Sequence, residues 1–489
     1  MCNPNVLSFN KKKEHKNCDD SDITEKKIRI GEVTRSEDHE VRLENLRKTV
    51  LYGSLSTAFL IGGFSICMPY TQARRDELNC DALCQGSITS FRSLLNLIGS
   101  VLLGRLSDGR IFGKSGRKVC LYIGAFGSSV DFLIMGSTFS INGIWWSVIF
   151  GSLLQHNFLI LKAMIADCYE NIDQYLISVK SSSTSSSAVR ASSIGKIGMS
   201  VGLAFMVGPI IGGYFVKDFE HGILVALGFI FISVFFIYKI PNYDSHAKKK
   251  ENDEKESSVK AIGASFFDFM KVKAARSPAA VFLMIVRTLM GLAYHIFNTI
   301  WTASLKRRFQ FGPADYGRFF SFIGLGFALS QGFVAGRLVR AFGPKRRTLL
   351  ISLCCIALGA GRWLAFHTQS IQVVYVLFFF IITALGVMNT VISADTSKIA
   401  SSDEIGGLTG LLDAVQSASG IMGPIIGGVL GRISWGKDIN STNSFAPLVA
   451  VVTTYGVILI LVVTGYEKYV INMEITNKSP KETLIKKEN

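Results

Sequence analysis

The hexapeptide Gly-Pro-Ile-Ile-Gly-Gly occurs twice in this chain, at 208–213 and at 423–428, each time inside a long apolar segment. Gly195 and Gly410 precede the two copies at equal distances, since 423 − 208 and 410 − 195 both equal 215. A repeated membrane segment indicates a chain built from two copies of one helical bundle. Such an architecture is typical of proteins that move small solutes.

Apolar runs long enough to cross a ~30 Å hydrocarbon layer, which takes about 20 residues, recur along the whole chain. Hydrophobic residues make up 49% of the sequence, too large a share for one soluble core of this length. We therefore predict an all-α polytopic membrane protein. Twelve spans are expected, at 50–72, 87–106, 118–138, 143–166, 194–216, 221–240, 278–303, 317–336, 348–366, 371–394, 406–431 and 445–467.

The formal net charge of +16 does not indicate a nucleic-acid binder. A nucleic-acid binder concentrates charge on one folded polar face. Here Lys and Arg fall mostly in alternate loops, as the positive-inside rule predicts, for example at 114–118, 248–250 and 345–347. Both termini are therefore expected in the cytosol, and the lipid bilayer is the expected environment. Lys306–Arg308 is an exception, because it falls on the predicted outer side.

Two more repeats divide the chain. The loop after the second span begins at Gly104 and its counterpart at Gly336, a shift of 336 − 104 = 232. Ile165-Ala166-Asp167 and Ser393-Ala394-Asp395 close the fourth and tenth spans with a shift of 228. The predicted parts are a disordered cytosolic segment 1–49, a first bundle 50–240, a charged cytosolic linker 241–277, a second bundle 278–467 and a cytosolic tail 468–489.

These segments resemble the major facilitator superfamily. The loop from Gly104 is similar to its signature of glycine, acid and basic residues, and the span containing 208–213 is similar to the antiporter motif of twelve-span drug/proton exchangers. Ala204 and Ser419 replace the usual middle glycine of that motif. The succession of Ile165-Ala166-Asp167, Arg190-Ala191 and the glycine-rich span after them resembles tetracycline-efflux proteins. The run from Ser321 resembles the eukaryotic organic-cation-transporter-like branch. The resemblance implies two six-helix bundles related by a pseudo-twofold axis along the membrane normal.

The resemblance also implies a latch on the cytosolic side and two kinked helices on which the bundles rock. Glycine lets membrane helices approach closely, and proline bends a helix. The expected gate residues are Gly104, Arg105, Asp108, Arg110, Arg117, Lys118, Asp167 and Asp413. The expected kink residues are Gly195, Gly208, Pro209, Gly212 and Gly213, with Gly410, Gly423, Pro424, Gly427 and Gly428 in the second bundle.

Ionisable residues inside spans cost about 2.5–3.5 kcal/mol each on insertion scales, so they are candidates for function. The spans hold Arg92, Asp131, His156, Lys162, Arg287, His295, Arg362 and Asp413. The resemblance implies that the first, fourth, seventh and tenth spans line the cavity. Polar residues at helical spacing on these spans are the expected substrate site: Ser152, Gln155, His156, Lys162, Arg287, Tyr294, His295, Asn298 and Asn389. His156, His295 and Asp131 are the candidates for proton coupling, because His titrates near neutrality and burial brings a carboxyl group into that range.

Three functions are considered. The first is a secondary transporter that exchanges small organic solutes, in particular cations, for protons. The second is a facilitator or symporter of another small metabolite, and the third is a transporter-shaped sensor or scaffold. Two departures from drug exchangers weaken antiport: no acid lies in the first span, and Val148 is near the place of the usual arginine of the fourth. No catalytic constellation, metal spacing or phosphate-binding loop is present, so an enzyme, a metal site, a cofactor or nucleotide-driven pumping is not expected, and the protein is expected to be monomeric.

Three local features concern processing and location. Cys80 and Cys84 share the first outer loop and either pair or stay free. Asn440-Ser441-Thr442 is a glycosylation sequon in the last outer loop. Lys486 and Lys487, near the carboxyl end, resemble a dilysine signal for retrieval to the endoplasmic reticulum, but they also fit an ordinary basic tail.

Overall fold

The computed structural model describes residues 5–107, 112, 115–178, 186–241, 273–343, 346–399, 405–435 and 445–471. Twelve helical segments of this part are long and apolar enough to cross a membrane, which confirms the predicted spans. The first half contains α1 (Asn5–Glu77), α2 (Ala82–Ser107), α3 (Gly116–Ser137), α4 (Ile141–Leu154), α5 (Asn157–Ser178), α6 (Ser186–Phe215) and α7 (Phe219–Lys239). The second contains η3 (Lys273–Arg276), α9 (Pro278–Phe309), α10 (Pro313–Leu329), η4 (Ser330–Val334), α11 (Ala335–Phe342), α12 (Arg347–His367), α13 (Ile371–Ile399), α14 (Ile405–Trp435), α15 (Phe445–Leu461) and η5 (Val462–Ile471).

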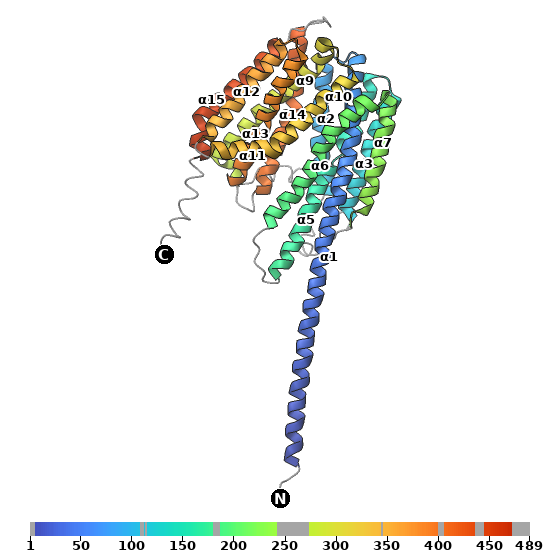
Figure 1. The fold of residues 1–489 in the computed structure, drawn as a ribbon, viewed down its shortest axis with the longest axis vertical. Coiled ribbons are helices and arrows are strands. Elements are labelled where there is room, and N and C mark those ends of the chain that lie inside the picture. The colour runs from blue at the N-terminus through green and yellow to red at the C-terminus, as the bar shows by residue number, and fades with distance from the viewer. Residues whose placement is uncertain are drawn as a thin grey trace, which may run out of the picture.

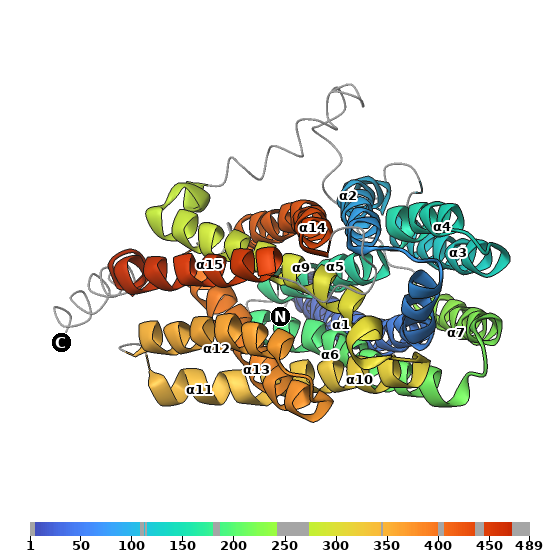
Figure 2. The ribbon, with the colours of Figure 1, turned by 90° about the horizontal axis from the view of Figure 1, so that it is seen from above.

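The helices form two bundles of six spans, side by side in Figures 1 and 2. We call the end of the bundles at which α1 enters the terminal face and the opposite end the distal face. α1 turns into α2 at the distal face, and α9 turns into α10 there. Figure 1 shows the bundles packed together at the distal face and splayed apart toward the terminal face.

The two bundles repeat each other in detail. Asn79 after α1 and Gln310 after α9 are the two non-glycine residues with positive φ in the described part of the chain, at 55° and 53°. Their numbers differ by 310 − 79 = 231. Asp131 in α3 and Arg362 in α12 are both buried inside their bundles and differ by 362 − 131 = 231. The predicted pair of bundles is therefore confirmed, with a shift near 230 outside the α6/α14 region.

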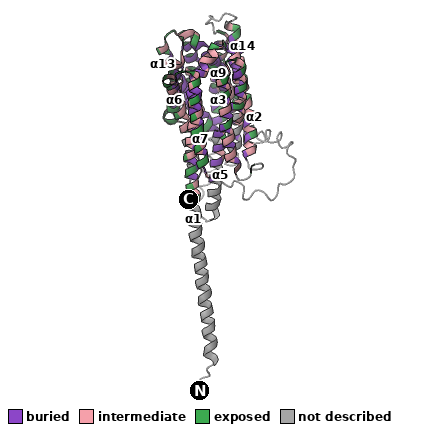
Figure 3. Ribbon diagram, turned by 90° about the vertical axis from the view of Figure 1, so that its right-hand side faces the viewer, coloured by how far each residue is buried: buried purple, intermediate pink, exposed green. Residues whose placement is uncertain are grey.

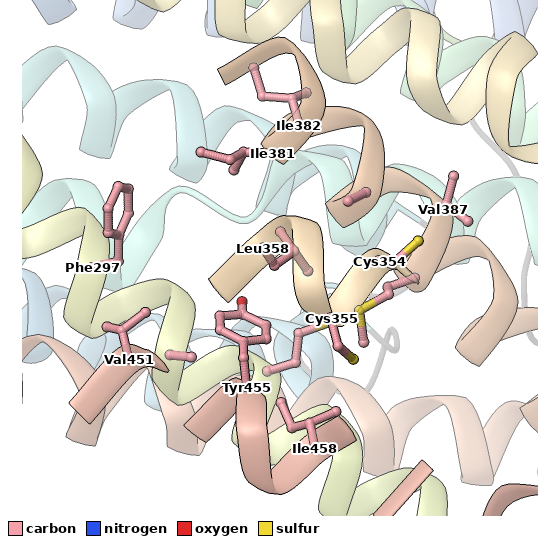
Figure 4. Packing of buried hydrophobic residues seen from close by; sticks show 14 of the residues in the cluster. Phe297, Cys354, Cys355, Leu358, Ile381, Ile382, Val387, Val451, Tyr455 and Ile458 are labelled. Atoms are coloured by element: carbon pink, nitrogen blue, oxygen red, sulfur yellow. The ribbon is translucent and has the colours of Figure 1, made fainter. Parts of the chain in front are cut away.

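Each bundle has its own core. Buried residues lie between the helices, and exposed apolar residues lie on the outside, where lipid takes the place of water (Figure 3). In the second bundle Phe297, Leu358, Ile381 and Tyr455 bring α9, α12, α13 and α15 together (Figure 4). The guanidinium of Arg362 lies 5.0 Å from the ring of Phe297 and 4.9 Å from the ring of Tyr455, so aromatic faces stabilise this buried charge.

The two copies of the hexapeptide line the seams between the bundles. α6 packs along α10, and α14 packs along α2. A Cβ on Gly317 would clash with the carbonyl oxygen of Pro209, and a Cβ on Gly86 would clash with that of Pro424. These are equivalent contacts, since 317 − 86 = 231. The remaining motif glycines also make matching contacts: Gly208 and Gly212 meet Ser65 and Ile66 of α1, whereas Gly423 and Gly427 meet His295 and Ile296 of α9.

Several expectations are refined by the structure. Residues 40–49, expected to be disordered, belong to α1, where Leu46 and Thr49 are buried. Cys80 and Cys84 form a disulfide. Arg308, on the side where the positive-inside rule expects few cations, donates to the carbonyl oxygens of Ala365 and Thr368 at 3.2 and 2.7 Å and so caps α12. Residues 242–272 of the linker lie outside the described residues, as do Asn440, Lys486 and Lys487.

Candidate substrate cavity

A cavity of about 230 Å³ lies in the first bundle, between α1, α2, the junction of α4 with α5, and α6. Its lining is mostly apolar on the α1 and α6 sides and mostly polar on the α2 and α4/α5 sides. The polar lining consists of Thr57, Arg92, Asn96, Ser152, Gln155 and Asn157. Leu60, Ile61, Phe64, Phe158 and Phe205 supply the apolar lining. The cavity therefore offers both polar and apolar contacts to a small solute at membrane depth.

The fourth span is interrupted at this cavity. α4 ends at Leu154 and α5 begins at Asn157, so Gln155 and His156 form a break within one membrane span. The N–H of Gln155 donates to Gly151 O at 3.1 Å, and the N–H of His156 donates to Leu154 O at 3.0 Å. Asn157 anchors the new helix by donating from Nδ2 to Leu121 O at 3.0 Å. Interrupted helices inside membranes occur where the freed backbone lines a cavity.

The break separates the predicted polar stripe of the fourth span. Ser152 and Gln155 line the cavity as expected. His156 turns toward α2, where a Cβ on Gly99 would lie 2.5 Å from its Nε2, and the same nitrogen lies 3.2 Å from Ser152 O. Lys162 places its ammonium 4.2 Å from the ring centre of Phe158, so it lies close to the cavity without lining it. No ion pair joins it to Asp167.

Asp131 lies directly behind the cavity wall. Its side chain is buried, and a Cβ on the cavity-lining Gly151 would clash with Oδ2. The hydroxyl group of the nearby Ser147 donates to Ile144 O at 3.0 Å, and Asp131 Oδ1 has no partner among the described residues. Arg92 and Arg75 are the cations that act on its charge. Because Gly151 has no side chain, only backbone separates this carboxyl group from the cavity.

The predicted residues of the second bundle form a separate polar group. Arg287 on α9 donates to Asn389 on α13 and to Gln416 on α14. Arg287 corresponds to Thr57, since 287 − 57 = 230, and Thr57 lines the cavity of the first bundle. Arg287 therefore occupies on α9 the position that Thr57 occupies on α1. Tyr294 and Asn298 are exposed on α9, and His295 packs its Cβ 2.6 Å from the position of a Cβ on Gly423 of α14, within the second bundle.

Each bundle holds one arginine–aspartate ion pair of matching position, and the pair in the first bundle joins two of the expected gate residues. Arg117 donates to Asp167 Oδ2 at 3.0 Å and to Ser107 Oγ at 2.8 Å. Arg347 donates to Asp395 Oδ1 at 2.6 Å, and Tyr466 donates to the same carboxylate. These ion pairs are equivalent, since 347 − 117 = 230 and 395 − 167 = 228. Burial and the Asp167 charge raise the pKa of the neighbouring Cys168 thiol to about 12, so this thiol adds no charge.

The other expected gate and kink residues are placed as follows. Lys118 donates to Tyr238 O and Ile240 O at 2.9 and 2.8 Å, so it caps α7 and does not join Asp167. Gly104 faces open space, with no atom within 4 Å of a Cβ there. Asp108 and Arg110 lie outside the described residues. Arg105, Gly195, Gly410 and Asp413 belong to described helices, but the burial and contacts of these four residues are not described.

Sequence reasoning missed Arg92, Asn96, Asn157 and Gln416 as site residues. Arg92 was recognised as an ionisable residue within a span, and its spacing of four from Asn96 places both on one face of α2, which is the available signal. Across the described residues no cluster of three or more His, Cys, Asp and Glu side chains is arranged to hold a metal ion.

Comparisons with known proteins agree with this architecture. A family model described as Major Facilitator Superfamily matches residues 50–424. Tetracycline resistance protein, class B, of Escherichia coli is 25% identical over 71% of this chain and 78% of its own length. Solute carrier family 22 member 18 of Mus musculus is 23% identical over 80% of this chain and 90% of its own length. The crystal structure of the human organic anion transporter MFSD10 matches with a TM-score of 0.59 and 18% identity, over 85% of this chain and 99% of that one.

Proposed function

Because the chain belongs to the major facilitator superfamily, whose members carry small solutes across membranes, we propose that it is a secondary active transporter coupled to protons through Asp131. The observation that carries the proposal is the position of this buried carboxyl group behind Gly151, at the edge of a cavity at membrane depth. A carboxyl group that gains and loses a proton beside the solute site links the two binding events.

The repeated seams support transport by rocking of the bundles. Gly86 and Gly317 allow the backbones of opposite bundles to touch near the distal face, without interlocking side chains. Smooth contacts of this kind are suited to two states that differ by a rigid-body rotation. We propose that the parts 50–240 and 278–467 move as units, joined by the linker 241–277, and that the arginine–aspartate pairs take part in closing the terminal face.

We propose that the terminal face is cytosolic and that the protein acts as a monomer in the plasma membrane or an endomembrane. Retrieval to the endoplasmic reticulum through Lys486 and Lys487 belongs to the same proposal. The other expected members of the solute and proton sites stay predictions; they are Ser152, Gln155, His156, Lys162, Arg287, Tyr294, His295, Asn298 and Asn389.

Solute and proton can move in opposite directions or in the same direction. The resemblance to drug exchangers implies antiport of organic cations, and this is the first candidate. Proton symport is the second, and the neighbourhood of Arg92 and Asp131 favours it. A solute anion at Arg92 would weaken the attraction between Arg92 and Asp131 and so favour a proton on Asp131. Solute and proton would then bind together.

The test is transport by the purified protein in liposomes with an imposed pH gradient. The labelled probes are benzenesulfonate and phenyltrimethylammonium, which keep their charge at all working pH values and do not leak as neutral forms. We expect the wild type to accumulate one of them against its gradient. Accumulation with an acidic interior indicates antiport, whereas accumulation with an acidic exterior indicates symport.

The variant Asp131→Asn should lose gradient-driven accumulation by about tenfold or more, because a carboxamide cannot take up and release the coupled proton. It should still exchange labelled for unlabelled probe, because exchange needs no net proton movement. Glu77→Gln, the same chemical change at an exposed carboxylate, is the matched control and should behave as wild type. Absence of accumulation of both probes in the wild type contradicts the proposed function, and full coupling in Asp131→Asn contradicts the role of Asp131.

A further inference from the structure

The interrupted fourth span has an unbalanced end. Three of the last four carbonyl groups of α4 have a nitrogen partner, because Gly151 O and Leu154 O accept backbone N–H groups and Ser152 O lies 3.2 Å from His156 Nε2. The first N–H groups of α5 have no acceptor within their own helix. α5 is 22 residues long, so its N-terminus carries the positive end of a full helix dipole. Asn157 and Phe158, the first two residues of α5, line the cavity.

A buried hydroxyl group beside this helix end lacks a partner. Ser152 is 3% exposed and lines the cavity, and its Oγ makes no hydrogen bond with the described residues. An unpaired buried polar group costs about 1–3 kcal/mol, which a ligand oxygen recovers. The hydroxyl proton of Ser152 is free to turn toward such an acceptor.

The ionisable side chain that lines the cavity is cationic. Arg92 lines the cavity and makes no ion pair with a described residue. Its guanidinium carbon lies 5.5 Å from the ring centre of Phe64. Lys162 lies above Phe158, one turn into α5. The lining contains no Asp or Glu, since Asp131 lies behind Gly151. The N-terminus of α5, the hydroxyl group of Ser152 and the guanidinium of Arg92 line the same cavity, and each favours a negatively charged ligand group there.

From this convergence we infer that the cavity binds a small organic anion, with its anionic group between Arg92, Ser152 Oγ and the N-terminus of α5. The body of the solute packs among Leu60, Ile61, Phe64 and Phe205, so it is apolar, and an aromatic ring fits this lining. The volume of about 230 Å³ is below the usual 300–1,000 Å³ of drug-sized pockets, which indicates a compact solute. The inference rests on the proposed transport function, because it takes this cavity as the solute site.

The test is equilibrium binding, which is independent of transport. The probes are benzoate, benzamide and benzylamine, which share one ring and differ in charge. Binding to the full-length protein in detergent at pH 7 is measured by the ligand-induced rise in melting temperature over a concentration series. We expect benzoate to bind at least tenfold more tightly than the other two.

Variants locate the anionic group. Arg92→Gln should weaken benzoate binding tenfold or more and abolish its preference over benzamide, whereas Arg92→Lys should keep part of that preference. Ser152→Ala should weaken benzoate binding severalfold and provides the same readout if Arg92→Gln does not fold. Arg432→Gln, at an exposed arginine of α14, is the control and should bind as wild type.

The two proposals fail in different ways. Tighter binding of benzylamine, equal binding of all three probes, no binding of benzoate, or an unchanged preference in Arg92→Gln and Ser152→Ala overturns the anion site and leaves the liposome result untouched. Benzoate binding together with absent transport in liposomes overturns the transport function instead.

Discussion

At the scale of single residues, Gln310 shows what the fold demands of one backbone position. It ends α9 in the left-handed conformation, with its N–H bonded to Lys306 O. Asn79 has this conformation in the first bundle, and asparagine tolerates it better than most residues do. Glutamine lacks this advantage, because its longer side chain is not placed to form the local hydrogen bond that offsets the crowding of Cβ against the following carbonyl group.

Replacing Gln310 should therefore separate backbone strain from side-chain contacts. Gln310→Gly removes the Cβ and should stabilise the protein by about 0.5–1 kcal/mol, the strain relieved being somewhat larger than the entropy that glycine adds to the unfolded chain. Gln310→Ala keeps the Cβ and is the matched control, for which we expect no gain. Thermal unfolding in detergent measures both. Equal melting temperatures of the two variants would contradict the presence of backbone strain at Gln310.

At the scale of elements, the fourth span marks the limit of sequence reasoning. Hydropathy predicted it as one helix, and the residues Leu154-Gln155-His156-Asn157 contain neither proline nor glycine to signal a break. The break depends on packing, because Asn157 bonds to Leu121 O on α3, a partner 36 residues away. Of the stripe expected on one continuous helix, Ser152 and Gln155 line the cavity, whereas His156 is directed toward α2.

The seams were easier to predict, because small residues there are required by close backbone approach. Gly86 touches Pro424 O across the α2/α14 seam, whereas Gly104 on the same helix has open space. Gly86→Ala should destabilise the closed distal face by about 1–3 kcal/mol, the usual cost of overpacking. Gly104→Ala should be neutral or slightly stabilising. Melting temperature and probe exchange in liposomes check this, and equal effects of the two substitutions would argue against a tight seam.

At the scale of the whole molecule, duplication made most of the fold predictable. Twelve spans follow from hydropathy, and the two bundles follow from the repeated hexapeptide. The contact of Asp131 with Gly151 was not predictable, since it joins two helices whose relative rotation no local pattern specifies. The same holds for Arg287, whose hydrogen bonds reach α13 and α14, 102 and 129 residues away.

The closed distal face also explains how the duplicated parts work together. Tyr316 of α10 is buried and donates to Asp76 Oδ2 of α1 at 2.6 Å, which joins the two bundles at that face. Gln72 and Gln85 hydrogen-bond around the same carboxylate. Opening the distal face must break this group and both glycine seams together, so the account requires a concerted movement of the bundles.

The most direct test measures this movement with pairs of spin labels, in protein whose Cys2 and Cys18 are replaced by serine. One pair, at Glu77 and Gln310, spans the distal face, and the other, at Val41 and Arg340, spans the terminal face; all four positions are exposed. We expect two conformations of the protein, whose populations shift with pH and with ligand. In one of them the spin–spin distance across the distal face is longer and the distance across the terminal face is shorter. A single, unchanged spin–spin distance for each pair under all conditions, or two distances that lengthen together, would contradict the proposed rocking movement of the bundles.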